Sequence, residues 1–487
     1  MVALREKAIL LAAALAAFGA SLAGPFHLDD YSILSDPVLT SPAGWREVWR
    51  PLRTRPLTQF TFWLNCQLGG THPWGYHAVN LALHLGVAVL AFEALARRLP
   101  RRAALAAAVL VGVHPVQAEA VNYIFARGTL LATLLCLASL ACWLSGRRWT
   151  AVAWFAAALA AKEECVAFPL ALLLLDRRNL APIAAMLALA AAAGTRVLWA
   201  AGAIPGAGAG AGSAVAALDY FAAQGVVILR YLRLFVIPWG FTIDPQMAPV
   251  PAGVAALAWL ALAAVAFALR KQAWFLAGLL LLLPSSSVFP ASDLAADRRL
   301  YLPLIAFGAA AAVPLSRVRW IWLAPPVLLL TALSAHRTWV WMSEERLWEE
   351  GVDRAPGKTR PRIQLARAAG GARAERLLRE AKAMAPGDPA PAAELGRLYL
   401  ETDRPGEALA EFGRALALEP NDPKGLNNRG AALAALGQRE AARADFERAL
   451  ERDPCLFDAR LNLRRLGAGQ PPPGYCRFTP DQARALR

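Results

Sequence analysis

The stretch AILLAAALAAFGASLAGPFHLDDY, from Ala8 to Tyr31, decides how the chain folds. Its apolar part predicts a helix embedded in a membrane, and the break at Gly24 ends that helix. Two adjacent carboxylates, Asp29 and Asp30, follow within a few residues, which places them at a membrane surface. Paired acids in that position can act as a general base or hold a divalent cation, and they also fit the solvated end of a span.

The composition of the 487-residue chain is typical of a membrane protein. Hydrophobic residues make up 57% of it, more apolar surface than a soluble globular chain can bury. The formal charge of +15 is not a nucleic-acid signal, because Lys and Arg lie in short clusters between apolar runs. The six cysteines include no CxxC pair and indicate neither zinc nor an iron–sulfur cluster.

Further apolar runs predict a polytopic, all-α membrane protein with about eleven spans. The basic clusters between the runs fall on one side, which the positive-inside rule assigns to the cytoplasm. The first run follows Arg5 and Lys7, so it is expected to be a retained anchor with a cytoplasmic N-terminus. The acidic pair and everything after residue 337 are then outside. The predicted spans lie near residues 8–24, 77–96, 103–120, 129–145, 149–161, 165–176, 180–200, 252–269, 273–289, 300–315 and 320–336.

Three segments of this membrane domain depart from simple spans. Residues 219–240 are largely apolar, but Arg230 and Arg233 interrupt the run, so we expect an amphipathic helix lying flat on the outer surface. The Gly- and Ala-rich residues 202–212 predict a flexible loop. The two runs between residues 149 and 176 are each too short to cross the bilayer, so we expect them to meet below its surface. That arrangement places Lys162, Glu163 and Glu164 in a protein-lined cavity.

After residue 337 a repeat of 34 residues replaces the apolar runs. Such a period, with small and aromatic residues at fixed positions, is typical of tetratricopeptide repeats, which stack into a short α-solenoid. The matching pairs are Ala408 and Ala442, Phe412 and Phe446, Ala415 and Ala449, and Pro420 and Pro454.

The repeat period predicts three domains: a membrane domain over residues 1–336, repeats with a capping helix over 337–466, and a Pro-rich tail over 467–487. Cys455 and Cys476 bracket the cap. Outside the cytoplasm these two thiols can form a disulfide, and two unrelated free thiols fit the spacing equally well.

Polar residues gather on the outer side of the predicted membrane domain. His77, Asn80 and His84 share one helical face, and exposing that face to lipid would be costly. Each residue alone also fits a structural role. Together they predict a cavity for a lipid-linked phosphorylated substrate, in which acids activate a hydroxyl group and arginines stabilise a departing phosphate. The other members are Arg55, His114, Glu119, Arg127, Lys162, Glu163, Arg298, Arg299 and Tyr301.

The order of these motifs resembles the transmembrane and TPR-containing O-mannosyltransferases. That family belongs to the GT-C superfamily of polyprenyl-phosphate-sugar-dependent glycosyltransferases. The motifs are LDD at 28–30, RPL at 55–57, YHAVNLALH at 76–84, HPVQAEAV at 114–121, ARG at 126–128, KE at 162–163, RRLYLP at 298–303, and the terminal repeats.

The resemblance implies an enzyme that moves mannose or another hexose from a polyprenyl-phosphate carrier to a hydroxyl group, with inversion at the anomeric carbon. It implies a Ser or Thr of a protein as acceptor, bound by the repeats, on the extracytoplasmic face. It further implies Asp29 or Asp30 as the base and Arg298 as a contact of the carrier phosphate. The sequence departs from the family where Asp297 precedes Arg298, since the family often has Glu there. A divalent cation stays an open alternative, and no other cofactor is implied.

Two alternatives remain for the function. The chain can be a non-catalytic membrane scaffold whose repeats recruit periplasmic partners, or an enzyme that glycosylates a lipid or glycan. A transporter is less favoured, because the polar groups gather at the outer face and not at the midplane. High Ala and Arg with few Lys is typical of a GC-rich bacterial genome, so we expect a bacterial inner membrane with periplasmic repeats.

Overall fold

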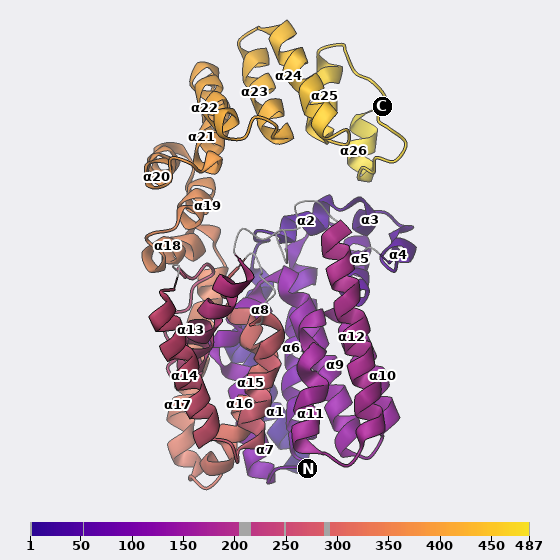
Figure 1. Cartoon of the computed structure of the whole chain (residues 1–487), viewed down its shortest axis with the longest axis vertical. Coiled ribbons are helices and arrows are strands. Elements are labelled where there is room, and N and C mark those ends of the chain that lie inside the picture. The colour runs from indigo at the N-terminus through magenta and orange to yellow at the C-terminus, as the bar shows by residue number, and fades with distance from the viewer. Residues whose placement is uncertain (1, 52, 204–215, 248–249, 287–292, 487) are drawn as a thin grey trace. The chain divides into compact units, whose positions relative to one another are not determined.

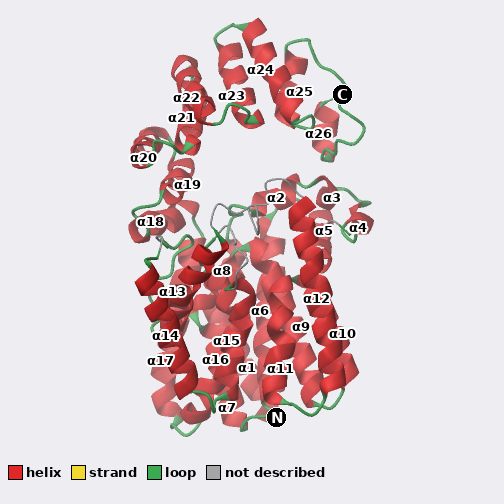
Figure 2. Ribbon diagram, viewed as in Figure 1, coloured by secondary structure: helices red, strands yellow, loops and turns green. Residues whose placement is uncertain are grey.

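The computed structural model describes residues 2–51, 53–203, 216–247, 250–286 and 293–486. Within these ranges the protein consists of helices joined by loops and contains no strand (Figure 2). The predicted all-α fold is therefore confirmed. The chain forms two compact units, one of Met1–Leu34 with Trp45–Ser343 and one of Ser35–Gly44 with Glu344–Arg487.

The first unit is a bundle of long apolar helices with short helices at their ends (Figure 1). Its α-helices are α1 Val2–Phe18, α2 Asp30–Ser35, α4 Gly44–Glu47, α5 Pro56–Gly69, α6 Pro73–Leu95, α7 Arg101–Val113, α8 Ala118–Asn122, α9 Arg127–Leu144, α10 Arg148–Ala161, α11 Phe168–Leu175, α12 Leu180–Ala203, α13 Ala217–Val236, α14 Ala252–Ala268, α15 Ala273–Leu282, α16 Tyr301–Leu315 and α17 Trp320–Trp341. Short 3-10 helices are η1 Gly19–Ala23, η2 Pro115–Gln117, η3 Ile124–Ala126, η4 Glu163–Ala167, η6 Leu283–Ser285 and η7 Asp297–Leu300.

Five described helices are long and apolar enough to cross a membrane: Leu4–Ala23, Pro73–Leu95, Ile124–Leu144, Leu180–Ala200 and Asp297–Leu315. The pair formed by Arg101–Val113 and Pro115–Asn122, bent by 48°, makes a sixth if it counts as one span. The other predicted apolar runs also lie on helices, most of which are shorter than these five. The total of eleven spans stays a prediction.

Small residues allow these helices to pack closely. Ala88, Ala91, Ala104 and Ala108 are fully buried in one core with the larger Phe92. Alanine has a high helix propensity, and its small side chain lets two helix backbones approach closely. Close packing of this kind holds apolar helices together in a membrane, where association buries no apolar surface from water. An Ala-rich sequence therefore specifies a tight bundle.

The predicted amphipathic helix is present as α13. Its buried face includes Tyr220, Val227 and Tyr231, and Gly225 lies where an added Cβ would approach the Trp259 indole of α14 to 3.0 Å. Its position relative to a membrane stays a prediction. The predicted flexible loop at 202–212 lies largely outside the described residues.

The second unit contains the predicted solenoid, which is confirmed. Its helices are α3 Pro37–Thr40, α18 Glu344–Arg354, α19 Thr359–Ala369, α20 Gly371–Met384, α21 Pro389–Glu401, α22 Pro405–Leu418, α23 Pro423–Ala435, α24 Arg439–Arg452, α25 Phe457–Arg465 and α26 Pro480–Ala485.

Two glycines explain why the repeat needs small residues. A Cβ on Gly396 would lie 2.7 Å from the ring of Phe412, and a Cβ on Gly430 would lie 2.7 Å from the ring of Phe446. Each phenylalanine is buried against the first helix of its own repeat. The same glycine and phenylalanine pair recurs 34 residues later, so each repeat packs in the same way.

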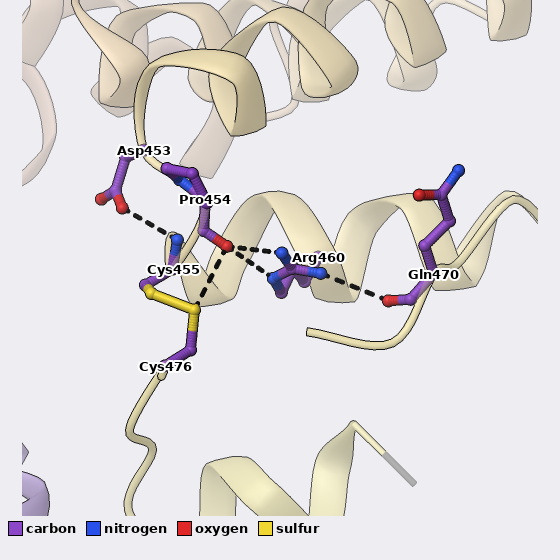
Figure 3. Close-up of a disulfide and its surroundings, with 6 residues drawn as sticks. All are labelled: Asp453, Pro454, Cys455, Arg460, Gln470 and Cys476. Carbon is purple, nitrogen blue, oxygen red and sulfur yellow. Dashed lines mark hydrogen bonds between the residues drawn. A yellow bond between two sulfur atoms is a disulfide. The ribbon is translucent and has the colours of Figure 1, made fainter. Parts of the chain in front are cut away.

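A disulfide between Cys455 and Cys476 closes the end of the repeats (Figure 3). Arg460 strengthens this closure, because its guanidinium donates hydrogen bonds to the carbonyl oxygens of Pro454 at 2.8 Å and Gln470 at 3.3 Å. The sequence did not decide whether these two cysteines are bonded or free. The disulfide links the tail to the residues just before the capping helix α25.

Candidate functional site

The two adjacent acids have different environments. Asp30 is fully buried at the start of α2, and its carboxyl oxygens accept hydrogen bonds from the backbone N–H groups of His27 at 2.9 Å and Phe125 at 2.7 Å. Burial raises the pKa of Asp30 to about 8. Asp30 is therefore mostly protonated at neutral pH and joins the loop before α2 to the segment after α8.

Asp29 is exposed and its carboxylate faces a tyrosine. The Tyr123 hydroxyl donates a hydrogen bond to Asp29 Oδ2 at 2.8 Å and lies 3.2 Å from the Asp29 backbone nitrogen. Leu28 before it has φ of 44°, a left-handed conformation that is uncommon for a branched side chain. This turn directs the two neighbouring acids to different surroundings.

Arg298 also lies against the Tyr123 ring, with its guanidinium carbon 6.0 Å from the ring centroid. Its side chain pairs with Glu119 and, at 3.3 Å, with Asp293. Its backbone N–H also donates to Glu119 at 3.0 Å. Tyr123 thus contacts both the exposed Asp29 carboxylate and a guanidinium that is paired with two acids.

A second group of charges extends the site. Arg55 pairs with Glu163, and Lys162 donates to Thr129 at 2.7 Å and pairs with Glu164 at 2.8 Å. The Arg55–Glu163 pair joins the predicted RPL and KE motifs. Arg298 of the RRLYLP motif lies near enough for its like charge to act on Arg55 and Lys162.

Lys162 lies in the extended break between α10 and η4. Lys162, Glu164 and Arg299 line a cavity of about 20 Å³, which is large enough for an ordered water. The predicted break between two short helices is therefore present, with Lys162 and Glu164 at a cavity. Glu163 pairs with Arg55.

The remaining predicted site residues contact protein groups. His77 lies 3.2 Å from the Pro25 carbonyl oxygen, and His114 lies 3.1 Å from that of Phe235. His84 lies 2.7 Å from the Tyr301 hydroxyl. These residues hold helix ends and loops in place, and a role in substrate binding stays a prediction for each.

Asn80 and Arg127 make the framework beneath the site. Arg127, fully buried, donates to Asn80 Oδ1 at 2.9 Å and to the Tyr76 carbonyl oxygen at 3.0 Å. Asn80 in turn donates to the Tyr123 carbonyl oxygen at 3.2 Å. Through Asn80, the buried arginine positions the tyrosine that contacts Asp29. Arg299 donates to the backbone carbonyls of Asp293 at 2.7 Å and Leu294 at 3.2 Å.

Sequence reasoning did not select Tyr123 or Thr129. Neither belongs to a charged motif, and a lone tyrosine at the end of an apolar run carries no signal of its own. Among the described residues, no group of three or more His, Cys, Asp or Glu is arranged to hold a metal ion.

Family models of the tetratricopeptide repeat match residues 371–427 and 423–454. A protein O-mannosyl-transferase of Caenorhabditis elegans is 35% identical over 156 residues, which cover 28% of this chain and 22% of that protein. Protein O-mannosyl-transferase TMTC4 of Homo sapiens is 42% identical over 100 residues, which cover 18% of this chain and 14% of that protein. The chain is similar to protein O-mannosyl-transferases over these segments. The resemblance found from the motifs is thus confirmed.

A third relative, protein O-mannosyl-transferase TMTC1 of Homo sapiens, is 33% identical over 147 residues, covering 27% of this chain and 17% of that protein. The alignments span less than a quarter of each of these relatives. The apolar helices and this similarity both indicate that the chain is a membrane protein. A solved structure of MamA matches 29% of the chain at 15% identity with a TM-score of 0.23, a likeness too weak to indicate a function.

Proposed function

We propose that this relative of the O-mannosyl-transferases moves a hexose from a polyprenyl-phosphate carrier to a Ser or Thr hydroxyl of a protein. The observation that supports this most directly is that Tyr123 contacts both Asp29 and Arg298. This arrangement combines an exposed carboxylate that can take a proton with a fixed guanidinium that can neutralise a phosphate.

Asp29 is the general base in this proposal. It accepts the proton of the acceptor hydroxyl as the new bond to the anomeric carbon forms, and the bond from that carbon to the carrier phosphate breaks. Attack from the face opposite the phosphate inverts the anomeric carbon. Asp30 is less suited to this role, because it is buried and burial raises its pKa to about 8.

The leaving phosphate is stabilised by the cationic groups of the cluster. Arg298 contacts the Tyr123 ring, and Lys162 and Arg55, each paired with a glutamate, are the other cations of the cluster. Arginine suits this role because its planar guanidinium binds two oxygens at once and keeps its charge when buried. An isoprenoid chain attached to that phosphate would lie among apolar helices, which favours a lipid-linked donor over a free nucleotide sugar.

The location we propose is a bacterial inner membrane with the repeats on the periplasmic side. The disulfide between Cys455 and Cys476 supports this orientation, since such bonds persist in oxidising compartments and are rare in the cytoplasm. The acidic pair then lies on the same side as the repeats, because the predicted cytoplasmic basic clusters lie at the opposite ends of the spans.

The test is sugar transfer by the purified full-length protein in detergent. A polyprenyl-phosphate mannose and a Ser- and Thr-containing peptide are supplied, and mass spectrometry detects the added hexose. We expect transfer with this donor and none with GDP-mannose. Transfer to a lipid or glycan in place of the peptide would contradict the protein acceptor, and a complete lack of transfer to any acceptor would favour a scaffold. Adding EDTA decides whether a divalent cation takes part.

A further inference from the structure

We propose that one end of the membrane unit binds the headgroup of an anionic phospholipid through arginines of three neighbouring loops. The proposal goes beyond the proposed function, and its test needs no sugar transfer. These loop arginines are Arg97, Arg98, Arg147, Arg177 and Arg178.

The three loops follow α6, α9 and α11, and hydrogen bonds join the first loop to the other two. Arg97 donates from Nε to the Ser145 hydroxyl, at the start of the second loop, at 3.1 Å. Arg98 donates to the carbonyl oxygen of Leu175, the last residue of α11, at 3.1 Å. Arginines that are distant in sequence therefore meet at the end of the bundle where α1 begins (Figure 1).

A salt bridge joins the second loop to the third. Arg148, the first residue of α10, pairs with Asp176 at 3.1 Å. Arg147 and Arg177 are each next in sequence to one member of this pair, which brings their backbones close together. Both of their side chains are exposed. The salt bridge therefore holds two further guanidinium groups beside each other in solvent.

The loop arginines have no acidic partner. Among the ion pairs of the described residues, none includes any of these five side chains, and the two arginines of the first loop donate only to uncharged oxygens. The nearby acids are already paired, Glu93 with Lys7 and Asp176 with Arg148. The like charges of the arginines repel one another, and an anion placed among them would offset this repulsion.

The position of the loops favours a lipid over a soluble anion. Three of the helices that can cross a membrane end or begin at these loops: Pro73–Leu95, Ile124–Leu144 and Leu180–Ala200. Trp149, close to the second loop, is 65% exposed, and exposed tryptophan at the end of a span is typical of the headgroup level of a membrane. Arginines at that level attract anionic lipids, because each guanidinium can bind two phosphate oxygens at once.

The test is native mass spectrometry of the purified full-length protein in detergent, which separates the free protein from the protein with one bound lipid. Phosphatidylglycerol is the anionic probe and phosphatidylcholine the zwitterionic one. Glycerol phosphate supplies a phosphate group without a lipid chain.

The variant to test is Arg147→Ala with Arg177→Ala. The matched control is Arg317→Ala with Arg319→Ala, which removes two exposed arginines from the single loop between α16 and α17. None of these four side chains bonds to another of the described residues, so both variants should fold. Circular dichroism checks that they do.

We expect the wild type to bind its first phosphatidylglycerol about tenfold more tightly than phosphatidylcholine. Arg147→Ala with Arg177→Ala should bind phosphatidylglycerol about tenfold to thirtyfold more weakly, whereas the control variant should bind it as the wild type does. Equal affinity of the wild type for the two lipids would overturn the proposal whether or not the variants fold. An equal loss in the control variant would overturn it as well, because any exposed arginine would then serve. If glycerol phosphate binds as tightly as phosphatidylglycerol, the ligand is a soluble anion and the assignment to a lipid is wrong.

Discussion

The membrane unit contains ion pairs between segments that lie far apart along the chain, whereas the ion pairs of the repeats lie within one repeat or join neighbouring repeats. In the membrane unit, Arg298 is separated by 179 residues from Glu119, and Arg55 by 108 from Glu163. In the repeats, Lys382 is 29 residues from Glu411, about one repeat away, and Arg443 is four from Glu447. The first arrangement exists only when the whole bundle is folded, whereas the second forms between neighbouring helices.

Both regions contain buried carboxylates that are paired with a cation. The Glu119 side chain is 6% exposed in the membrane unit, and those of Glu411 and Asp445 are 9% and 6% exposed in the repeats. A carboxylate in an apolar surrounding is costly unless it is paired, but an exposed pair such as Arg443 and Glu447 is nearly neutral in energy. The comparison teaches that the two regions differ in how far along the chain a buried carboxylate lies from its partner.

The largest effect on stability is expected from Arg298→Ala. This change leaves Glu119 buried without its guanidinium partner, which costs about 3–5 kcal/mol. Thermal unfolding in detergent, followed by tryptophan fluorescence, measures it. Adding Glu119→Gln should restore most of the stability but no transfer activity. A single variant as stable as the wild type would show that the two regions do not differ in this respect.

The disulfide gives the next largest effect, and this effect is confined to the repeats. Replacing both Cys455 and Cys476 by Ser should destabilise the end of the array by about 3 kcal/mol, because the bond limits the unfolded chain. Hydrogen exchange of the full-length protein should show faster exchange in α25 and unchanged exchange in α6 and α9. Faster exchange in the membrane unit as well would contradict this localisation.

The pH dependence of stability comes from Asp30. Its pKa in the folded protein is about 8, above the ordinary value of 3.8, so the folded state holds the proton more tightly than the unfolded state between these values. Its stabilisation is complete below about pH 4 and is lost as the pH rises through about 8. The slope is at most about 1.4 kcal/mol per pH unit for one proton. Melting curves from pH 5 to 8 should therefore be flatter for Asp30→Asn, and equal slopes in both proteins would contradict the assignment.

The smallest effect is expected from Arg443→Ala in the repeats. Its partner Glu447 is one helical turn away and both side chains are exposed, so the pair is expected to contribute little to stability. Chemical unfolding of the variant, compared with that of Arg298→Ala, sharpens the contrast between the two regions. A loss of stability as large as that of Arg298→Ala would remove the contrast.

The repeats were predictable from sequence because their structure is local. The spacing of Gly396 and Phe412, repeated at Gly430 and Phe446, predicts the contact that the structure contains. The all-α bundle followed from its apolar runs, and the break at Lys162 followed from two runs too short to cross a bilayer. The sequence did not decide whether the disulfide forms, because spacing alone does not distinguish a bonded pair from two free thiols.

The site was only partly predictable, because its contacts join distant segments. Motif resemblance selected Asp29, Arg298 and Lys162, but periodicity gave no reason for Tyr123 to lie between the first two. The sequence also gave no reason to assign different roles to Asp29 and Asp30, which are adjacent and of the same residue type. Their difference arises from the turn at Leu28, which directs Asp30 toward backbone N–H groups and leaves Asp29 exposed.

The most direct test of the proposed chemistry compares hexose transfer by purified Asp29→Asn and Asp30→Asn proteins at neutral pH. We predict that Asp29→Asn lowers kcat about 10³-fold, as loss of a general base does, with its melting temperature unchanged. Asp30→Asn, which resembles a protonated acid, should keep activity within about tenfold of the wild type. The opposite result, with Asp30→Asn folded but inactive and Asp29→Asn active, would contradict the assignment of Asp29 as the base.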